Sequence, residues 1–146
     1  MSNTQMPTPE RSTAFSYRAE VVKVVDGDTV DLKLFRKIRY EFDAGFNIKS
    51  SLEYEASTIQ RLRLAGINTP ELRGEEREAG LAAKEALIKL LESGPLTAHS
   101  YKASAFEMPA DKYGRWLAVI EVTLESGVVN VNEWLIANGF AVVYLP

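Results

Sequence analysis

The feature that most constrains the fold is a pair of apolar runs joined by a tight turn. Residues 19–25 and 29–35 are rich in valine and leucine, and Asp26-Gly27 separates them. In the second run apolar and polar residues alternate, so one face of that segment is apolar. Asp-Gly between alternating runs is typical of a β-hairpin, because both residues tolerate the backbone angles of a tight turn. We therefore expect a hairpin that buries one face and carries Asp28 at its turn.

Two segments have helical spacing. Residues 75–92 place alanine and leucine three and four positions apart, and a Gly-Pro pair follows, which predicts an amphipathic helix. Asn130, with Glu133 three positions later, has the pattern of a capping box and predicts a shorter helix that ends at Gly139. The remaining apolar runs predict strands at residues 60–65, 96–102, 116–124 and 140–144.

The order of these elements limits the fold. Short strands with one helix between the third and fourth strands, and another before the last strand, predict an α+β, mainly β, fold. The expected architecture is a five-stranded Greek-key barrel of the OB type with two helices. With 146 residues the chain has the size of one domain. We assign residues 16–146 to that domain and the polar residues 1–15 to a disordered lead-in.

Residues 36–58 form an insertion that mixes charged and aromatic residues. We expect this insertion to be an extended hairpin or a lid. Its aromatic side chains have two possible roles: they cover the edge of the barrel, or they stack on the bases of a single nucleic-acid strand. These side chains are Tyr40, Phe42, Phe46 and Tyr54.

Composition excludes several kinds of site. The chain has no cysteine, so it has no disulfide, zinc–thiolate site or cysteine nucleophile. Its single histidine, His99, lies in an alternating run and is predicted to be an exposed strand residue, which leaves oxygen ligands for any metal. The formal net charge is −3. Because the chain lacks a basic overall field, nucleic acid would be bound at a local site, weakly and with strong salt dependence.

The sequence shows no sign of membrane insertion or export. No apolar stretch is long enough to span a bilayer, and the first residues lack the apolar core of a secretory signal. We therefore expect no membrane partner and a cytoplasmic location, while secretion of a processed form stays open.

Three short segments contain the residue types that phosphate chemistry needs. Carboxylate and carbonyl oxygens bind divalent cations, and planar guanidinium groups pair bidentately with phosphate oxygens. Each segment alone is weak evidence for such a site, because Asp-Gly-Asp, for example, is commonly only a turn. The ordered set is far more specific: it comprises residues 26–29, residues 63–71 and residues 111–115.

In this order the segments resemble the staphylococcal nuclease family, also called thermonuclease-like, over residues 19–143. The resemblance implies the OB barrel. The family's compact secreted members carry a third, C-terminal helix after the last strand, which we do not expect in this chain. The resemblance also implies roles for single residues. Arg63 and Arg115 fall on the two phosphate-clamping arginines, and Glu71 falls on the catalytic glutamate, a general base or water-orienting group. Asp28 falls on the metal-binding aspartate.

A calcium site is also implied by the resemblance, formed by Asp28, residue 68 and the backbone carbonyl of Thr69. The family usually has aspartate at the position of Asn68. Asparagine keeps an oxygen ligand but removes one negative charge, and fewer ligand charges weaken calcium binding. The expected cofactor is therefore a divalent metal, Ca²⁺, held at a weakened site.

Further residues are candidates for substrate contact. The resemblance implies that Lys112 and Tyr113, beside Arg115, contact the nucleic acid. Arg61 shares a strand face with the predicted clamp and is an auxiliary phosphate contact. Tyr144 is a candidate for the family's base-stacking tyrosine, although its spacing from the end of the last helix differs.

Two functions of different classes remain open. The first is a calcium-dependent endonuclease that hydrolyses phosphodiester bonds of DNA and RNA with little sequence preference and leaves 3′-phosphate ends. The second is a non-catalytic OB-fold module that binds single-stranded nucleic acid or a protein partner. The enzyme is favoured by the presence of Arg63, Glu71 and Arg115. The binding module is favoured by Asn68 and by the negative net charge of the chain. Monomer and weak homodimer are both open.

Overall fold

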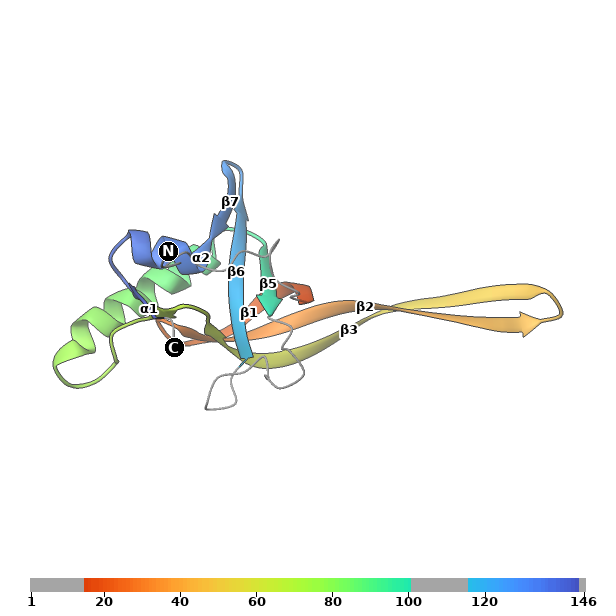
Figure 1. Cartoon of the computed structure of the whole chain (residues 1–146), viewed down its shortest axis with the longest axis horizontal. Coiled ribbons are helices and arrows are strands. Elements are labelled where there is room, and N and C mark those ends of the chain that lie inside the picture. The colour runs from red at the N-terminus through yellow and green to blue at the C-terminus, as the bar shows by residue number, and fades with distance from the viewer. Residues whose placement is uncertain (1–14, 101–115, 145–146) are drawn as a thin grey trace, which may run out of the picture.

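The computed structural model describes residues 15–100 and 116–144, which form an elongated β structure with two α-helices (Figure 1). In chain order the elements are β1 (Phe15–Asp26), β2 (Thr29–Gly45), β3 (Ile48–Leu64), β4 (Ile67–Asn68), the 3-10 helix η2 (Gly74–Glu76), α1 (Arg77–Leu91), β5 (Leu96–Ser100), β6 (Trp116–Leu124), β7 (Gly127–Asn130), α2 (Val131–Ala137) and β8 (Val142–Val143).

A parallel pairing closes the sheet into a barrel. β1 pairs with β2 on one side and with β5 on the other, β2 pairs with β3, and β5 pairs with β6, all antiparallel. β3 then meets β6 in parallel, from the pair Leu62 and Trp116 to the pair Leu64 and Ala118. Strands β1, β2, β3, β6 and β5 thus form a closed ring, which confirms the predicted five-stranded barrel of the OB type.

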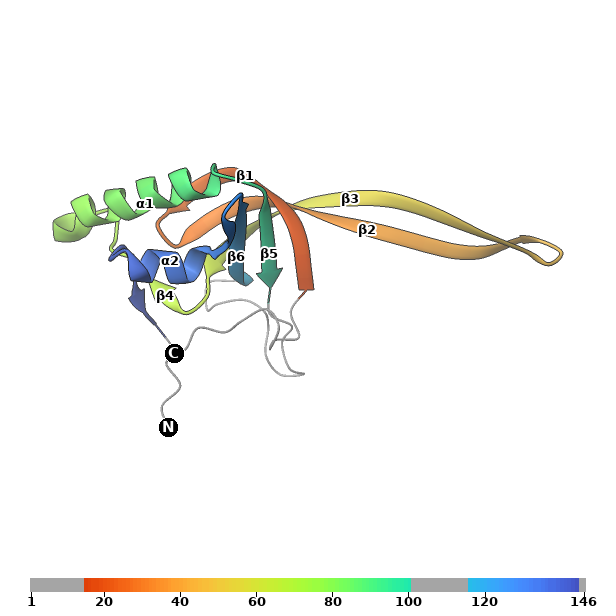
Figure 2. The ribbon, with the colours of Figure 1, turned by 90° about the horizontal axis from the view of Figure 1, so that it is seen from above.

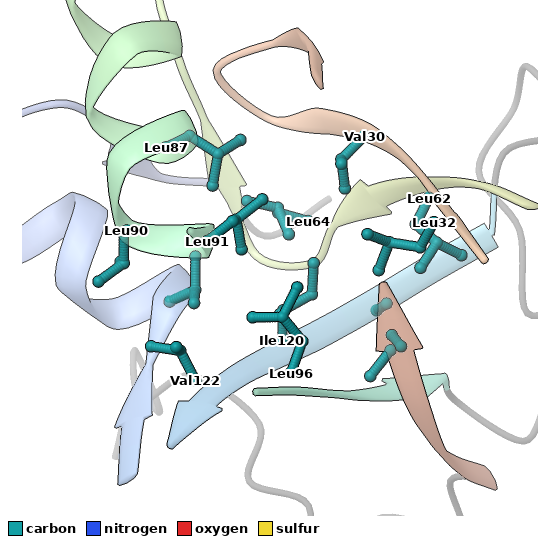
Figure 3. Close-up of a cluster of buried hydrophobic side chains, with 14 of the residues drawn as sticks. Val30, Leu32, Leu62, Leu64, Leu87, Leu90, Leu91, Leu96, Ile120 and Val122 are labelled. Carbon is teal, nitrogen blue, oxygen red and sulfur yellow. The ribbon is translucent and has the colours of Figure 1, made fainter. Parts of the chain in front are cut away.

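Alternating apolar residues fill this barrel. Val30 and Leu32 of β2, Leu62 and Leu64 of β3, and Ile120 of β6 are fully buried in one cluster (Figure 3). Helices α1 and α2 lie together on one side of the strands (Figure 2). α1 packs against β1 and α2 packs against β6, so the two helices cover the core.

The predicted insertion is a long two-stranded hairpin. β1 pairs with β2 only as far as Phe35, and from Arg36–Ala56 to Gly45–Ile48 the strands β2 and β3 pair with each other. This part of the hairpin projects away from the barrel (Figures 1 and 2). We call residues 36–58 the arm.

The first of the two expected roles for the aromatic residues of the arm was wrong, because these residues do not cover the barrel edge. Tyr40 is 65% exposed and Phe46 is 92% exposed, and Phe42 and Tyr54 are exposed as well. The reason is the pairing of β2 with β3, which is regular from Arg36–Ala56 to Asp43–Lys49 and carries these residues away from the barrel on a two-stranded ribbon. The expectation of an extended hairpin is confirmed.

His99 also differs from the prediction, because it is buried rather than exposed. Its Nδ1 lies 2.7 Å from Ser16 Oγ, and its Nε2 lies 2.7 Å from Glu121 Oε1. The alternating pattern places His99 on one face of β5 but does not show that neighbouring strands supply polar partners on that face. These partners compensate for the burial of the ring.

Some element boundaries moved. The first helix begins with the 3-10 turn η2, and α1 itself starts at Arg77 rather than at residue 75. The cap of α2 is confirmed, since the Asn130 side chain accepts a hydrogen bond from the Glu133 backbone N–H. The last strand is only Val142–Val143. β1 starts at Phe15, so the remainder of the predicted lead-in lies outside the described residues.

No helix in residues 15–100 and 116–144 is long and apolar enough to cross a membrane.

Candidate active site

Two turns and helix α1 meet at one place on the barrel. Gly27 lies in the turn between β1 and β2, and Thr69 follows β4. A Cβ atom at Gly27 would lie 2.9 Å from both the Ala83 Cβ of α1 and the Thr69 Oγ1. Contact this close requires glycine, so the β1–β2 turn is pressed against the segment that leads to Glu71.

Asp28 is held by both of these segments. Its Oδ2 accepts a hydrogen bond of 3.2 Å from the Thr69 backbone N–H, and its Oδ1 accepts one of 3.1 Å from Thr29 Oγ1. Burial raises the pKa of Asp28, but hydrogen bonds from Asp26 and Thr69 and the positive charge of Arg63 outweigh it and keep the pKa below its ordinary value. Asp28 is therefore a carboxylate at neutral pH.

Arg63 is buried at the end of β3 and has a fixed orientation. Its Nη1 donates to the backbone carbonyls of Leu64 at 3.0 Å and Ile67 at 2.9 Å. Its Nη2 lies 3.6 Å from Asp28 Oδ2 and donates to Asn68 Oδ1. These contacts hold the guanidinium plane beside the Asp28 carboxylate, so the positive charge of Arg63 is already in position at the site.

Asp26 is a site residue that the sequence analysis did not assign. Its Oδ1 accepts a hydrogen bond of 3.1 Å from the Asp28 backbone N–H. Burial, together with the neighbouring Asp28 carboxyl, raises the pKa of Asp26 to about 6. The signal for this residue was the repeat of aspartate across one turn glycine, since a tight turn brings both carboxyl groups to the same side.

The predicted metal ligands Asp28, Asn68 and Thr69 come together. Asn68 ends β4 and pairs with Val142 of β8, and its side-chain oxygen accepts a hydrogen bond from the Arg63 Nη2 that lies beside Asp28. The side-chain oxygens placed here are those of the Asp28 carboxylate and the Asn68 amide, and oxygen donors of these kinds suit a hard cation such as calcium. Among the described residues no group of three or more His, Asp or Glu side chains could hold a metal ion, so a metal would depend on neutral oxygens as well.

Glu71 is exposed, but its backbone is fixed. The carboxylate Oε2 lies 3.6 Å from Arg73 Nε, and both side chains are largely exposed. The backbone carbonyl lies against Gly80 of α1, where a Cβ atom would approach the carbonyl oxygen to 2.4 Å. The side chain can therefore move while its attachment point stays close to the site.

Arg61 lies two residues before Arg63 and is paired elsewhere. Its Nε and Nη2 donate to the two carboxylate oxygens of Asp31, at 2.8 and 3.1 Å. The hydrogen bond from Arg61 also lowers the pKa of Asp31. A phosphate would have to compete with this surface ion pair, and the proposed role of Arg61 stays a prediction.

The predicted residues Lys112, Tyr113 and Arg115 lie outside the described residues. Tyr144 is placed near the site, with the Arg63 Cζ 5.7 Å from its ring centroid. The Tyr144 backbone N–H donates to the Gly66 carbonyl, which ties the end of the described chain to the loop after β3.

Comparison with known proteins adds an independent finding. A family described as "Staphylococcal nuclease homologue" matches residues 61–145. The chain is 28% identical to an uncharacterized protein of Methanocaldococcus jannaschii over 152 residues, which covers 88% of this chain and 60% of that protein. It is 27% identical to a micrococcal nuclease of Shigella flexneri over 133 residues, covering 88% of this chain and 59% of the relative. The chain thus spans less than two thirds of the length of these curated relatives.

Proposed function

Because this chain belongs to the staphylococcal nuclease family, we propose that it is a metal-dependent nuclease that hydrolyses phosphodiester bonds of DNA and RNA. The observation that carries this proposal is the placement of Arg63. Its side chain is only 11% exposed, two backbone carbonyls fix it, and it lies beside the Asp28 carboxylate. A buried, fixed guanidinium at the edge of an acidic turn suits a phosphate whose negative charge grows during reaction.

Asp28, Asn68 and the Thr69 carbonyl would hold the metal, and we propose Ca²⁺. When bound, the ion supplies a Lewis acid that polarises a phosphate oxygen and a water molecule. The oxygen-only donor set and the depressed pKa of Asp28 support this choice. The amide of Asn68 provides no charge, so calcium binds more weakly than it would to an aspartate at this position.

The protein groups then have separate roles. Arg63, with Arg115 as the second clamp, binds the phosphate oxygens and stabilises their growing charge. Glu71 accepts a proton from water while the water oxygen bonds to phosphorus. The bond from phosphorus to the 5′ oxygen breaks, that oxygen takes up a proton from solvent water, and the products are a 3′-phosphate and a 5′-hydroxyl. Lys112, Tyr113 and Arg61 contact the remaining substrate.

A non-catalytic binding module is the second candidate. Two observations favour it: Asn68 Oδ1 accepts a hydrogen bond from Arg63, and the Glu71 carboxylate points to solvent beside Arg73. In such a module the barrel would bind a single strand or a protein without cutting it.

One experiment separates the two functions. Purified protein is incubated with end-labelled single- and double-stranded DNA and with RNA, in calcium and in a chelator. The nuclease predicts calcium-dependent fragments with 3′-phosphate ends, and the Arg63→Lys variant should produce far fewer. Binding of the same oligonucleotides without cleavage under every metal condition would establish the binding module instead.

A further inference from the structure

The arm has two chemically different faces. Directly opposed residues in an antiparallel pair lie on the same face, and successive residues along each strand alternate between faces. The register pairs Ile38 with Tyr54 and Tyr40 with Leu52, and Phe42 opposes Ser50. One face therefore carries aromatic and aliphatic side chains without a charge between Ile38 and Phe42. We call this the apolar face of the arm, and it comprises Ile38, Tyr40, Phe42, Leu52 and Tyr54.

The opposite face carries every charged side chain of the arm except Arg36, and ion pairs link most of them. Arg39 lies 3.1 Å from Glu41 and 3.0 Å from Glu53, and Lys49 lies 3.0 Å from Asp43. Such pairs suit a surface that faces water, and each contributes little to stability. The sequence has thus segregated its ion pairs from its aromatic residues along the whole ribbon.

Most side chains of the apolar face are exposed to solvent. Tyr40, Phe42, Leu52 and Tyr54 are all exposed, as is Phe46 at the tip. Within the described residues, the parts of β2 and β3 that form the arm pair only with each other. A lone two-stranded hairpin is at best marginally stable in water, so a projecting arm of this kind gains from a partner on its apolar face.

A nucleic acid is a poor match for this face. The arm contains four basic residues, Arg36, Lys37, Arg39 and Lys49, and four acidic residues, Glu41, Asp43, Glu53 and Glu55, so its net charge is zero. Binding to a polyanion depends on an excess of positive charge. Only Arg36, at the base of the arm, shares the apolar face with the aromatic residues.

A second copy of this chain is a suitable partner for the apolar face. A symmetric dimer brings the same patch of both copies together, so the patch must be compatible with a second copy of itself. An uncharged apolar face meets this condition, because no like charges are opposed. From their exposed fractions, Tyr40, Phe42, Leu52 and Tyr54 offer roughly 430 Å² per copy, and Phe46 at the tip adds about 180 Å², which together is about three quarters of the share of one partner in a standard interface. We propose that two chains dimerise by stacking the apolar faces of their arms.

The length of the arm sets how the copies lie. Ten residues of β2, from Arg36 to Gly45, span roughly 34 Å. With the arms antiparallel, Tyr40 and Leu52 lie near the two-fold axis, and the tip of each arm reaches the base of the other. At that base a cavity of about 220 Å³ opens on the apolar side, lined by Tyr17, Leu34, Arg36, Ala56, Ser57, Thr58 and Trp116. The exposed ring of Phe46 is the side chain that would enter it.

Sedimentation of the full chain tests the proposal with a matched pair of variants. Leu52→Lys places a charge on the apolar face, whereas Ser51→Lys places the same charge on the next residue, which lies on the opposite face beside Glu41. We expect wild type and Ser51→Lys to be dimers at about 50 μM, a concentration that populates a specific interface of standard size. The dimer dissociation constant of Leu52→Lys should rise on the order of 100-fold, since the lysine would be buried without a partner.

A second measurement does not depend on an added charge. The chain has no cysteine, so a single engineered cysteine reports its own contacts. Under mild oxidation Leu52→Cys should form a covalent dimer, because a disulfide requires Cβ atoms about 4 Å apart, and Ser51→Cys should not. Circular dichroism melts establish that all four variants are folded.

Several results would overturn the proposal. A monomeric wild type at 50 μM excludes the dimer, and equal masses for Leu52→Lys and wild type exclude this face as the interface. Equal cross-linking of Leu52→Cys and Ser51→Cys does the same. If Tyr40→Ser weakens binding of a single-stranded oligonucleotide without changing the mass of the particle, the face binds bases instead. Cleavage activity is not the readout, so the outcome does not depend on the proposed nuclease function.

Discussion

Gly80 of α1 lies directly against the backbone of Glu71. A Cβ atom at position 80 would approach the Glu71 carbonyl oxygen to 2.4 Å and the Pro70 carbonyl oxygen to 2.9 Å. Real Cβ atoms do not come this close to backbone oxygen, so either the helix or the Glu71 segment must move to admit a side chain. The proposed base is therefore positioned by a helix that contributes no side chain to the chemistry.

Gly80→Ala should displace Glu71 and lower cleavage. Because a shift of about 1 Å at a reacting group costs up to 10²-fold, we expect kcat to fall on the order of 10- to 100-fold. Overpacking costs about 1–3 kcal/mol, and the better helix propensity of alanine offsets about 1 kcal/mol of that. Initial rates and thermal melts measure both effects. Ala82→Ser, at an exposed position of α1, is the control and should leave both near wild type.

Glu71→Gln tests the base directly. Removing a general base costs on the order of 10²–10⁴-fold in kcat, while substrate binding should be kept because the amide has the same shape. Single-turnover cleavage and oligonucleotide binding are measured on the same preparation. Glu75→Gln, in the neighbouring η2 turn, provides the control. A Glu71→Gln enzyme with wild-type turnover would remove Glu71 from the mechanism.

Arg63→Lys keeps the charge but loses the planar fork that Leu64 and Ile67 hold in place. We expect a loss on the order of 10²-fold or more in kcat, and the same for Arg115→Lys. Arg39→Lys, on the charged face of the arm, is the control for a general effect of the substitution. Near-normal rates in both Arg63→Lys and Arg115→Lys would favour a diffuse basic surface over a bidentate clamp.

Asn68→Asp should tighten calcium binding. A second anionic oxygen beside Asp28 strengthens a calcium site, so the calcium concentration for half-maximal activity should fall. Asp28→Ala should remove metal dependence and activity together. Calorimetric titration of calcium into both variants and wild type measures this. Equal affinities for wild type and Asn68→Asp would mean that residue 68 does not contact the metal.

Asp26 predicts a pH dependence of stability. Burial raises the pKa of Asp26 to about 6, from 3.8, so the folded state keeps a proton that the unfolded chain loses as pH rises from about 4 to 6. The contribution of Asp26 to stability therefore falls across this window. In chelator, Asp26→Asn should be more stable than wild type at pH 7, by about 1 kcal/mol after allowance for solvent screening, and not at pH 3.5. Denaturant titrations at both pH values measure the difference, and an equal gain at both would exclude the titration of Asp26 as its cause.

Local patterns were enough to predict the first hairpin and the two helices, but not the short strands β4 and β7. The Asp26-Gly27 turn, the helical spacing before Gly94 and the Asn130 cap all act over a few residues, and the structure has a hairpin and two helices at these places. The order of these elements also predicted the barrel, because few folds place one helix between the third and fourth strands. Motif order likewise predicted the family.

Only the tertiary structure decides which groups lie opposite each face of a strand. Alternation shows which residues share a face, but His99 is buried because Ser16 and Glu121 meet it there, and Tyr40 is exposed because nothing in the described chain does. Asp28 and Thr69 are 41 residues apart and are joined across the β1–β2 turn, which glycine at position 27 lets approach α1. Sequence fixes conformations through local sterics and hydrogen bonding, whereas burial and the pKa of a carboxyl group depend on atoms that only folding brings near.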